Sequence, residues 1–144
     1  MVNLQDIQKS NASLQSLPPP GRLIAVFAGA TSGIGLHALK AFARYVPAPT
    51  AFVICRSRAR SAHIIDELKT INPNGVWEFI EAEVSLIKEV DRVCEEIKTT
   101  PGVDHVDILF LSPGFLSFGE REGLDDSFLF SFIILQVHTR ERFH

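Results

Sequence analysis

Short β-branched apolar runs alternate with amphipathic helical patterns along most of the chain. Two such runs, residues 23–27 and 51–55, are each followed by apolar residues that recur every three or four positions. That spacing predicts a helix after each strand, with one apolar face turned toward a sheet. The predicted helix faces consist of Leu39, Phe42 and Val46 in the first unit, and of Ile64, Leu68 and Ile71 in the second.

The alternation continues through residue 111. Residues 76–80 predict a third strand, and residues 106–111 predict a fourth. Between them lies a helical pattern with Ser85 as its expected N-cap and with an apolar face of Leu86, Val90, Val93 and Ile97. Proline and glycine interrupt the chain where helices should end and strands begin. Strands that alternate with helices predict an α/β fold with a parallel sheet covered on both faces.

A glycine-rich stretch, residues 28–35 (AGATSGIG), joins the first predicted strand to the first helix. Gly29, Gly33 and Gly35 have a G-x-x-x-G-x-G spacing, which permits a sharp turn, a close approach of ligand to backbone, and tight packing of helix on strand. The free N–H groups and the dipole at the helix start favour a phosphate there. A P-loop is excluded, because no Gly-Lys-Ser/Thr follows. The alternative is a tight strand-to-helix connection that binds nothing.

These residues resemble the short-chain dehydrogenase/reductase family over positions 23–114. The family motif T-G-x-x-x-G-I-G is matched from Gly29 to Gly35, with Ala28 in place of the opening threonine. Residues 83–85 (Glu-Val-Ser) match the acidic–apolar–serine pattern after the third strand, whereas residues 111–114 (Leu-Ser-Pro-Gly) depart from the family's N-N-A-G. The resemblance implies a Rossmann-like, doubly wound parallel sheet, incomplete here with about four strands.

The resemblance also implies a nicotinamide nucleotide that lies across the carboxyl ends of the strands. The main chain around Thr31, Ser32, Gly33 and Ile34 would hold the pyrophosphate. Glu83 and Val84 would meet the adenine ring. Ser112 and Gly114 complete the expected cofactor-binding set, with Gly114 near the ribose.

The end of the second strand bears on the choice of cofactor. An acidic side chain there would accept the ribose hydroxyls of NAD, whereas a guanidinium would bind the 2′-phosphate of NADP. Residues 55–60 (Cys-Arg-Ser-Arg-Ala-Arg) contain no acid, so NADP(H) is favoured over NAD(H), with Arg56 as main partner and Ser57 and Arg58 as helpers. Basic residues at a helix start oppose its dipole and indicate a nearby anion. The alternative is a solvated basic face.

The chain carries no catalytic pair of the family type. Hydride transfer to a carbonyl needs a proton donor, which the family supplies with Tyr-x-x-x-Lys and an upstream serine. The only tyrosine, Tyr45, is followed four residues later by Pro49, and the last lysine is Lys98. We therefore expect no activity from this polypeptide alone. The NADP-dependent ketone or alcohol chemistry, in fungal secondary metabolism, would belong to a longer form. The alternative is a non-catalytic nucleotide-binding remnant or an interaction partner.

Three segments are expected: a lead at 1–22 with a short amphipathic helix, a nucleotide-binding Rossmann half at 23–115, and an atypical tail at 116–144. Residues 128–137 are a nearly continuous apolar run. Ten residues are too few to cross a bilayer, which takes about 20. The tail is expected to be a foreign or prematurely ended reading of the gene. Alternatively, it is a buried helix or a surface through which copies of the chain associate.

Composition restricts the remaining classes of function. With 144 residues, 46% of them hydrophobic, the chain can bury one core. A net charge of −3 gives no support for nucleic-acid binding. The histidines show no metal-ligand spacing. Cys55 and Cys94 fall in predicted elements and are expected to be reduced core residues of a cytoplasmic protein. The first residues contain no apolar run typical of a signal peptide.

Overall fold

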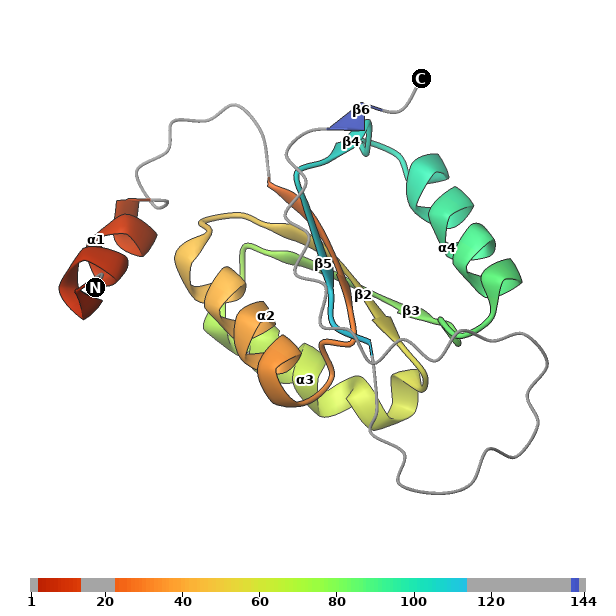
Figure 1. Cartoon of the computed structure of the whole chain (residues 1–144), viewed down its shortest axis with the longest axis horizontal. Coiled ribbons are helices and arrows are strands. Elements are labelled where there is room, and N and C mark those ends of the chain that lie inside the picture. Colours follow the sequence, from red (N-terminus) through yellow and green to blue (C-terminus); the bar gives the residue numbers. More distant parts are fainter. Residues whose placement is uncertain (1–2, 14–22, 114–140, 143–144) are drawn as a thin grey trace.

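A four-stranded parallel sheet forms the centre of the chain, in a computed structural model that describes residues 3–13, 23–113 and 141–142. The strand order is β3-β2-β1-β5, with β1 at Ile24–Ala28, β2 at Thr50–Cys55, β3 at Val76–Glu81 and β5 at Ile108–Leu111 (Figure 1). The chain starts in an inner strand, moves outward to β3, and then crosses over to the far side of β1. This arrangement confirms the Rossmann-like, doubly wound α/β fold.

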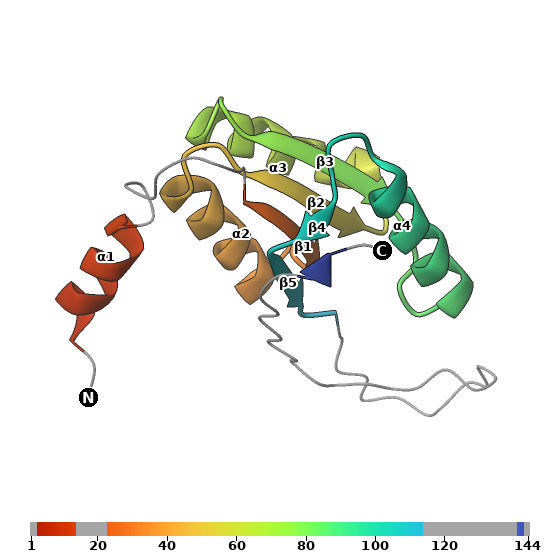
Figure 2. The same ribbon diagram turned by 90° about the horizontal axis from the view of Figure 1, so that it is seen from above.

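Helices cover both faces of the sheet. Figure 2 shows α2 (Gly33–Tyr45) and α3 (Arg58–Ile71) on one face and α4 (Ile87–Thr99) on the other. The predicted faces of α2 and α3 are confirmed, because their apolar residues enter the core against β1, β2 and β3. In α4 only Val93 and Ile97 are buried, whereas Leu86 is 54% and Val90 39% exposed. The expected apolar face of this helix is therefore buried only at Val93 and Ile97. The N-terminal α1 (Leu4–Ser13) forms as expected and buries none of its residues.

The predicted strand at 106–111 is divided in two by Asp107. Its N–H donates to the carbonyl of Ile24 over 2.8 Å, and its Oδ2 accepts from the Ile24 N–H over 2.9 Å. Asp107 thus binds both the carbonyl and the N–H of Ile24, the first residue of β1. The short β4 (His105–Val106) before it pairs antiparallel with β6 (Glu141–Arg142) instead of continuing the parallel sheet.

The end of α2 is held by the buried side chain of Asn72. Its amide nitrogen donates to the carbonyls of Ala43 and Val46, at 3.0 and 2.7 Å, and its Oδ1 accepts from the Asn74 N–H. The last carbonyls of a helix have no partner within the helix. Asn72 therefore satisfies groups of α2 that the fold would otherwise bury unpaired.

Replacing Asn72 with alanine is expected to lower the free energy of unfolding by about 2–3 kcal/mol, because buried carbonyls lose their donor. Urea unfolding followed by circular dichroism would measure the change. Asn74→Ala is the matched control, since the exposed Asn74 contributes its main-chain N–H, which alanine keeps. Equal losses from the two variants would contradict the role assigned to Asn72.

Candidate functional site

Gly29, in the loop after β1, and Gly35, in the first turn of α2, are both required by close backbone packing. A Cβ at Gly29 would lie 2.2 Å from the carbonyl oxygen of Ser112, and the φ of Gly29 is +78°. A Cβ at Gly35 would lie 2.2 Å from the carbonyl oxygen of Gly29. The first glycine thus lets the loop after β1 touch the loop after β5, and the third seats α2 on the end of β1.

Gly33 has a different role, because its surroundings are open. A Cβ there would meet nothing within 4 Å, although its φ of +55° favours glycine. It is the first residue of α2, whose N-cap Ser32 makes no side-chain cap bond and whose first turn contains no acid. The first N–H groups of a helix have no acceptor within it. The start of α2 is therefore an uncompensated positive end next to open space, which fits a phosphate.

The start of α3 differs, since Glu81 already compensates it. Oε2 of Glu81 accepts from the N–H of Arg58 over 2.8 Å, and the Ser57 hydroxyl oxygen accepts from the Arg60 N–H over 3.4 Å. Glu81 is thus an anion within the protein at the start of α3. Its charge offsets both the helix dipole and the nearby arginines. The dipole of α3 no longer requires an external anion, and Ser57 has a structural role as N-cap.

Arg56 remains a candidate by its position. It follows the last residue of β2, is exposed, and has no ion pair within the part of the chain that the structure describes. An exposed guanidinium at the carboxyl end of a strand beside β1 is suited to a phosphate that extends from a ligand in the crevice.

The ends of the four strands meet at one edge of the sheet, as expected. Ser112 N–H donates to the Ala28 carbonyl over 2.8 Å, and Ala82 N–H donates to the Cys55 carbonyl over 2.9 Å. These bonds hold the loops after β1, β5, β2 and β3 side by side. The described members of the predicted cofactor set lie on these loops or in the first turns of α2 and α3, and Gly114 lies outside the described residues.

The loop after β3 is ordered by its own carboxylate. Oε1 of Glu83 accepts from the Ser85 hydroxyl over 3.0 Å. The prediction of Ser85 as N-cap was wrong, because the helix is capped at Leu86, which has no side-chain cap bond. Glu83 is exposed and Val84 half-buried. Their contact with an adenine stays a prediction.

Neither Tyr45 nor Cys55 offers reactive chemistry in this crevice. Tyr45 ends α2 at the opposite edge of the sheet, where it lines a shallow hollow with Leu23 and Ile108. Burial raises the pKa of the Cys55 thiol, which therefore stays protonated. Cys94 is exposed, so its expected place in the core was wrong.

The sequence did not predict that Glu81 caps α3 or that Arg92 binds the end of β3. The guanidinium of Arg92 donates to the carbonyl of Glu81 over 2.7 Å and pairs with Glu89 and Glu96. It thereby ties α4 to the end of β3. The i, i+3 and i, i+4 spacing of these acids was a readable signal for the pairs on the helix. Nothing in the sequence pattern indicated the bond to β3 or the capping of α3 by Glu81.

Within residues 3–13, 23–113 and 141–142, no helix combines the length and apolarity that a membrane crossing requires. The same residues contain no cluster of three His, Cys, Asp or Glu side chains arranged to hold a metal ion. The apolar run at 128–137 and the association proposed for it lie outside the described residues. A cytoplasmic location stays a prediction.

The parallel sheet, the glycine loop and the open start of α2 define a Rossmann fold of the nucleotide-binding class. No protein-family model matches the chain. An oxidoreductase of Emericella nidulans is 42% identical over 147 residues, which cover 99% of this chain and 41% of that protein. A short-chain dehydrogenase/reductase of Stachybotrys chartarum is 30% identical over 138 residues, covering 85% of this chain and 39% of that protein.

A solved structure agrees with these relatives. L-sorbose reductase from Gluconobacter frateurii, crystallised with NADPH and L-sorbose, is 25% identical and superposes with a TM-score of 0.61. The superposition covers 74% of this chain and 39% of the reductase. The chain belongs to the short-chain dehydrogenase/reductase family. It spans about two fifths of the length of the relatives that it matches.

Proposed function

We propose that the chain binds NADP(H) across the carboxyl ends of β1, β2, β3 and β5. The observation that carries this proposal is the open space at Gly33 beside the uncompensated start of α2. The main chain from Thr31 to Ile34 would bind the pyrophosphate, and Arg56 would bind the 2′-phosphate. The NADPH complex of L-sorbose reductase, a protein of the same fold, supports a nicotinamide dinucleotide as the ligand.

We further propose that the chain does not by itself reduce ketones or oxidise alcohols. Bound NADPH supplies a hydride, and the reaction also needs a proton donor beside the carbonyl oxygen. Tyr45 lies at the wrong edge of the sheet to donate that proton. The family's chemistry would then require a longer polypeptide, and this chain would contribute the nucleotide site. Reduction of a ketone by the purified chain with NADPH would contradict this second proposal alone.

Arg56→Ala is expected to weaken NADPH binding by about 10- to 100-fold, as expected for the loss of a charge-assisted contact to phosphate. NADH lacks the 2′-phosphate, so its affinity should change by less than about twofold. Isothermal titration calorimetry with both nucleotides would measure these changes.

Lys69→Ala is the matched control, because Lys69 is an exposed cation in the last turn of α3, far from the carboxyl ends of the strands where Arg56 lies. Its removal should leave both affinities unchanged. Wild-type protein that binds NADH as tightly as NADPH, or an Arg56→Ala variant that loses both equally, would overturn the assignment of Arg56.

A further inference from the structure

The strand β5 lies at one edge of the parallel sheet and has an unpaired side there. In the strand order β3-β2-β1-β5, it pairs only with β1 among the residues that the structure describes. Its residues, Ile108–Leu111, include no charged side chain and no proline. Natural proteins rarely leave such an edge open, because its free N–H and C=O groups can pair with another strand. We therefore expect a further segment to cover β5.

The hydrogen bonds to β1 show which backbone groups of this edge point outward. The Asp107 N–H donates to the Ile24 carbonyl over 2.8 Å, so it points toward β1. Along a strand, the backbone N–H and C=O groups of successive residues point to opposite sides in turn. Those of Leu109 therefore face β1 as well. The groups that face away from β1 belong to Val106, Ile108 and Phe110.

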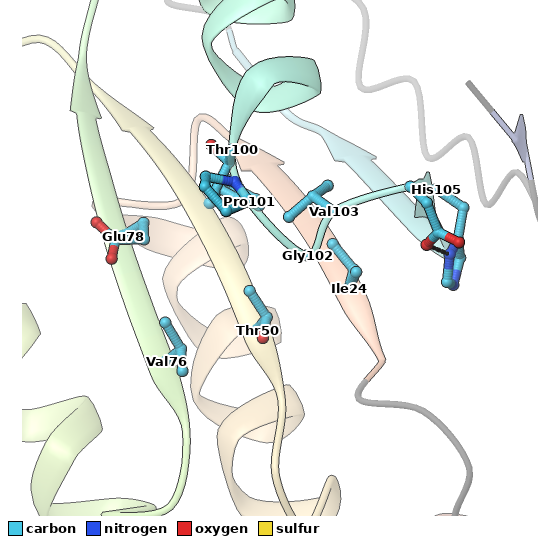
Figure 3. Close-up of a pocket in the computed structure, with 11 residues that line it drawn as sticks. Ile24, Thr50, Val76, Glu78, Thr100, Pro101, Gly102, Val103 and His105 are labelled. Atoms are coloured by element: carbon cyan, nitrogen blue, oxygen red, sulfur yellow. Dashed lines mark hydrogen bonds and ion pairs between the residues drawn. The ribbon is translucent and has the colours of Figure 1, made fainter. Parts of the chain in front are cut away.

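The pairing of β4 with β6 places a further strand on this outer side. His105 lies opposite Arg142, and Val106 lies opposite Glu141, in antiparallel order. Figure 3 shows the loop after α4 running past Ile24 to His105, which brings β4 to the start of β1 on the side away from β2. Because β4 leads directly into β5, the strand β6 lies at the amino end of the open edge of β5.

The same register, continued, places the residues before β6 beside β5. In an antiparallel pair, each step forward on one strand is a step back on the other, so position 139 falls opposite Ile108 and position 137 opposite Phe110. The sequence at 135–140 suits this place. Leu135, Val137 and Thr139 alternate there with Gln136, His138 and Arg140. Such alternation is typical of a strand with one buried face.

The less polar side of this alternation falls on the face of the sheet that α2 covers. Directly opposite residues of paired strands point to the same face, so Val137 would share the face of Phe110. The Phe110 ring packs against Phe27, with 5.4 Å between the ring centroids, and Phe27 packs against Phe42 of α2 at the same separation. Val137 would therefore extend an apolar layer that already exists, and His138 would point to the other face.

We propose that residues 136–140 form a fifth strand of the sheet, antiparallel to β5 and continuous with β6. Val137 would exchange backbone hydrogen bonds with Phe110, and Thr139 with Ile108. A segment of the same chain is favoured over a second copy, because β6 already holds this segment at the edge and gives it a high effective concentration there. The pairing uses only the outer side of β5 and requires no nucleotide.

Amide hydrogen exchange of the ¹⁵N-labelled full chain, without nucleotide, tests the pairing. Leu109 is the internal reference, because its N–H faces β1 whether or not the edge is covered. If residues 136–140 cover the edge, the amides of Ile108 and Phe110 should exchange within about tenfold of the Leu109 rate. Exchange at Ile108 and Phe110 about 100-fold or more faster than at Leu109 would overturn the proposal.

Val137→Pro and His138→Pro are a matched pair of variants, because proline removes one backbone N–H. In the proposed register, the N–H of residue 137 faces β5, whereas that of residue 138 faces away from it, where an edge strand tolerates proline. Val137→Pro should speed exchange at Ile108 and Phe110 by about tenfold, the effect of about one hydrogen bond. His138→Pro should change both rates by less than about twofold. Equal or reversed effects would refute this register.

The dependence on protein concentration identifies which chain covers the edge. Pairing within one chain predicts the same exchange rates at Ile108 and Phe110 after an about tenfold dilution, because no association is involved. Faster exchange on dilution, together with a dimer in analytical ultracentrifugation, would assign the edge to a second copy and overturn the proposal.

Discussion

Gly35→Ala is expected to unfold the chain or to lower its free energy of unfolding by about 3 kcal/mol or more, the upper range for overpacking. The new Cβ would lie 2.2 Å from the carbonyl oxygen of Gly29 and 2.9 Å from the Cα of Ala30. Both contacts are to backbone, which cannot swing aside as a flexible side chain can. Helix α2 would have to separate from the end of β1. Urea denaturation followed by circular dichroism measures the loss.

Gly102→Ala is the control for the effect of adding a methyl group. Its φ of +83° makes alanine strained, but a Cβ there meets nothing within 4 Å. The expected cost is about 1–2 kcal/mol, from backbone strain alone. If Gly35→Ala cost no more than Gly102→Ala, the tight seat of α2 on β1 would be refuted.

Gly33→Ala is expected to have the largest effect on binding, with a loss of about 100-fold for NADPH and NADH alike. The Cβ would occupy the open space beside the start of α2, where the pyrophosphate must approach the main chain. Lost contacts between N–H groups and a charged phosphate account for about 2–3 kcal/mol. Because none of the described residues has an atom within 4 Å of that Cβ, the fold should lose only about 1–2 kcal/mol, from the positive φ.

The pattern across nucleotides separates this variant from Arg56→Ala. Loss of both nucleotides identifies a contact to the shared pyrophosphate, whereas loss of NADPH alone identifies a contact to the 2′-phosphate. Calorimetry on the two variants, with circular dichroism to verify folding, makes the distinction. A folded Gly33→Ala protein that binds NADPH as wild type does would refute the pyrophosphate site.

Much of the fold could be predicted because buried strands form short apolar runs, whereas in helices the apolar residues recur every three or four positions. The four parallel strands, the faces of α2 and α3, and the order of the loops followed from apolar spacing and from glycine and proline positions. The glycine spacing predicted a sharp turn, close approach and tight helix packing, but the separate roles of Gly29, Gly33 and Gly35 are visible only in the structure, because Gly29 packs against the distant Ser112.

What the sequence did not reveal depends on contacts between residues far apart in the chain. Asp107 interrupts a strand pattern because its carboxylate binds Ile24, 83 positions away. Glu81 caps a helix that begins 23 residues earlier. Leu86 and Val90 fit the apolar period of α4 and are still exposed, because periodicity identifies an apolar face without showing what covers it.

The most direct test of nucleotide binding at the glycine loop is the amide spectrum of the ¹⁵N-labelled chain during a titration with NADPH. Binding there predicts the largest shifts at Gly29, Ser32, Gly33 and Ile34, with smaller shifts at Arg56 and Ser112. The amides of Thr50 and Val76, at the opposite edge of the sheet, should stay unchanged. A spectrum unaltered at saturating NADPH, or one that changes only at that opposite edge, would contradict the assignment.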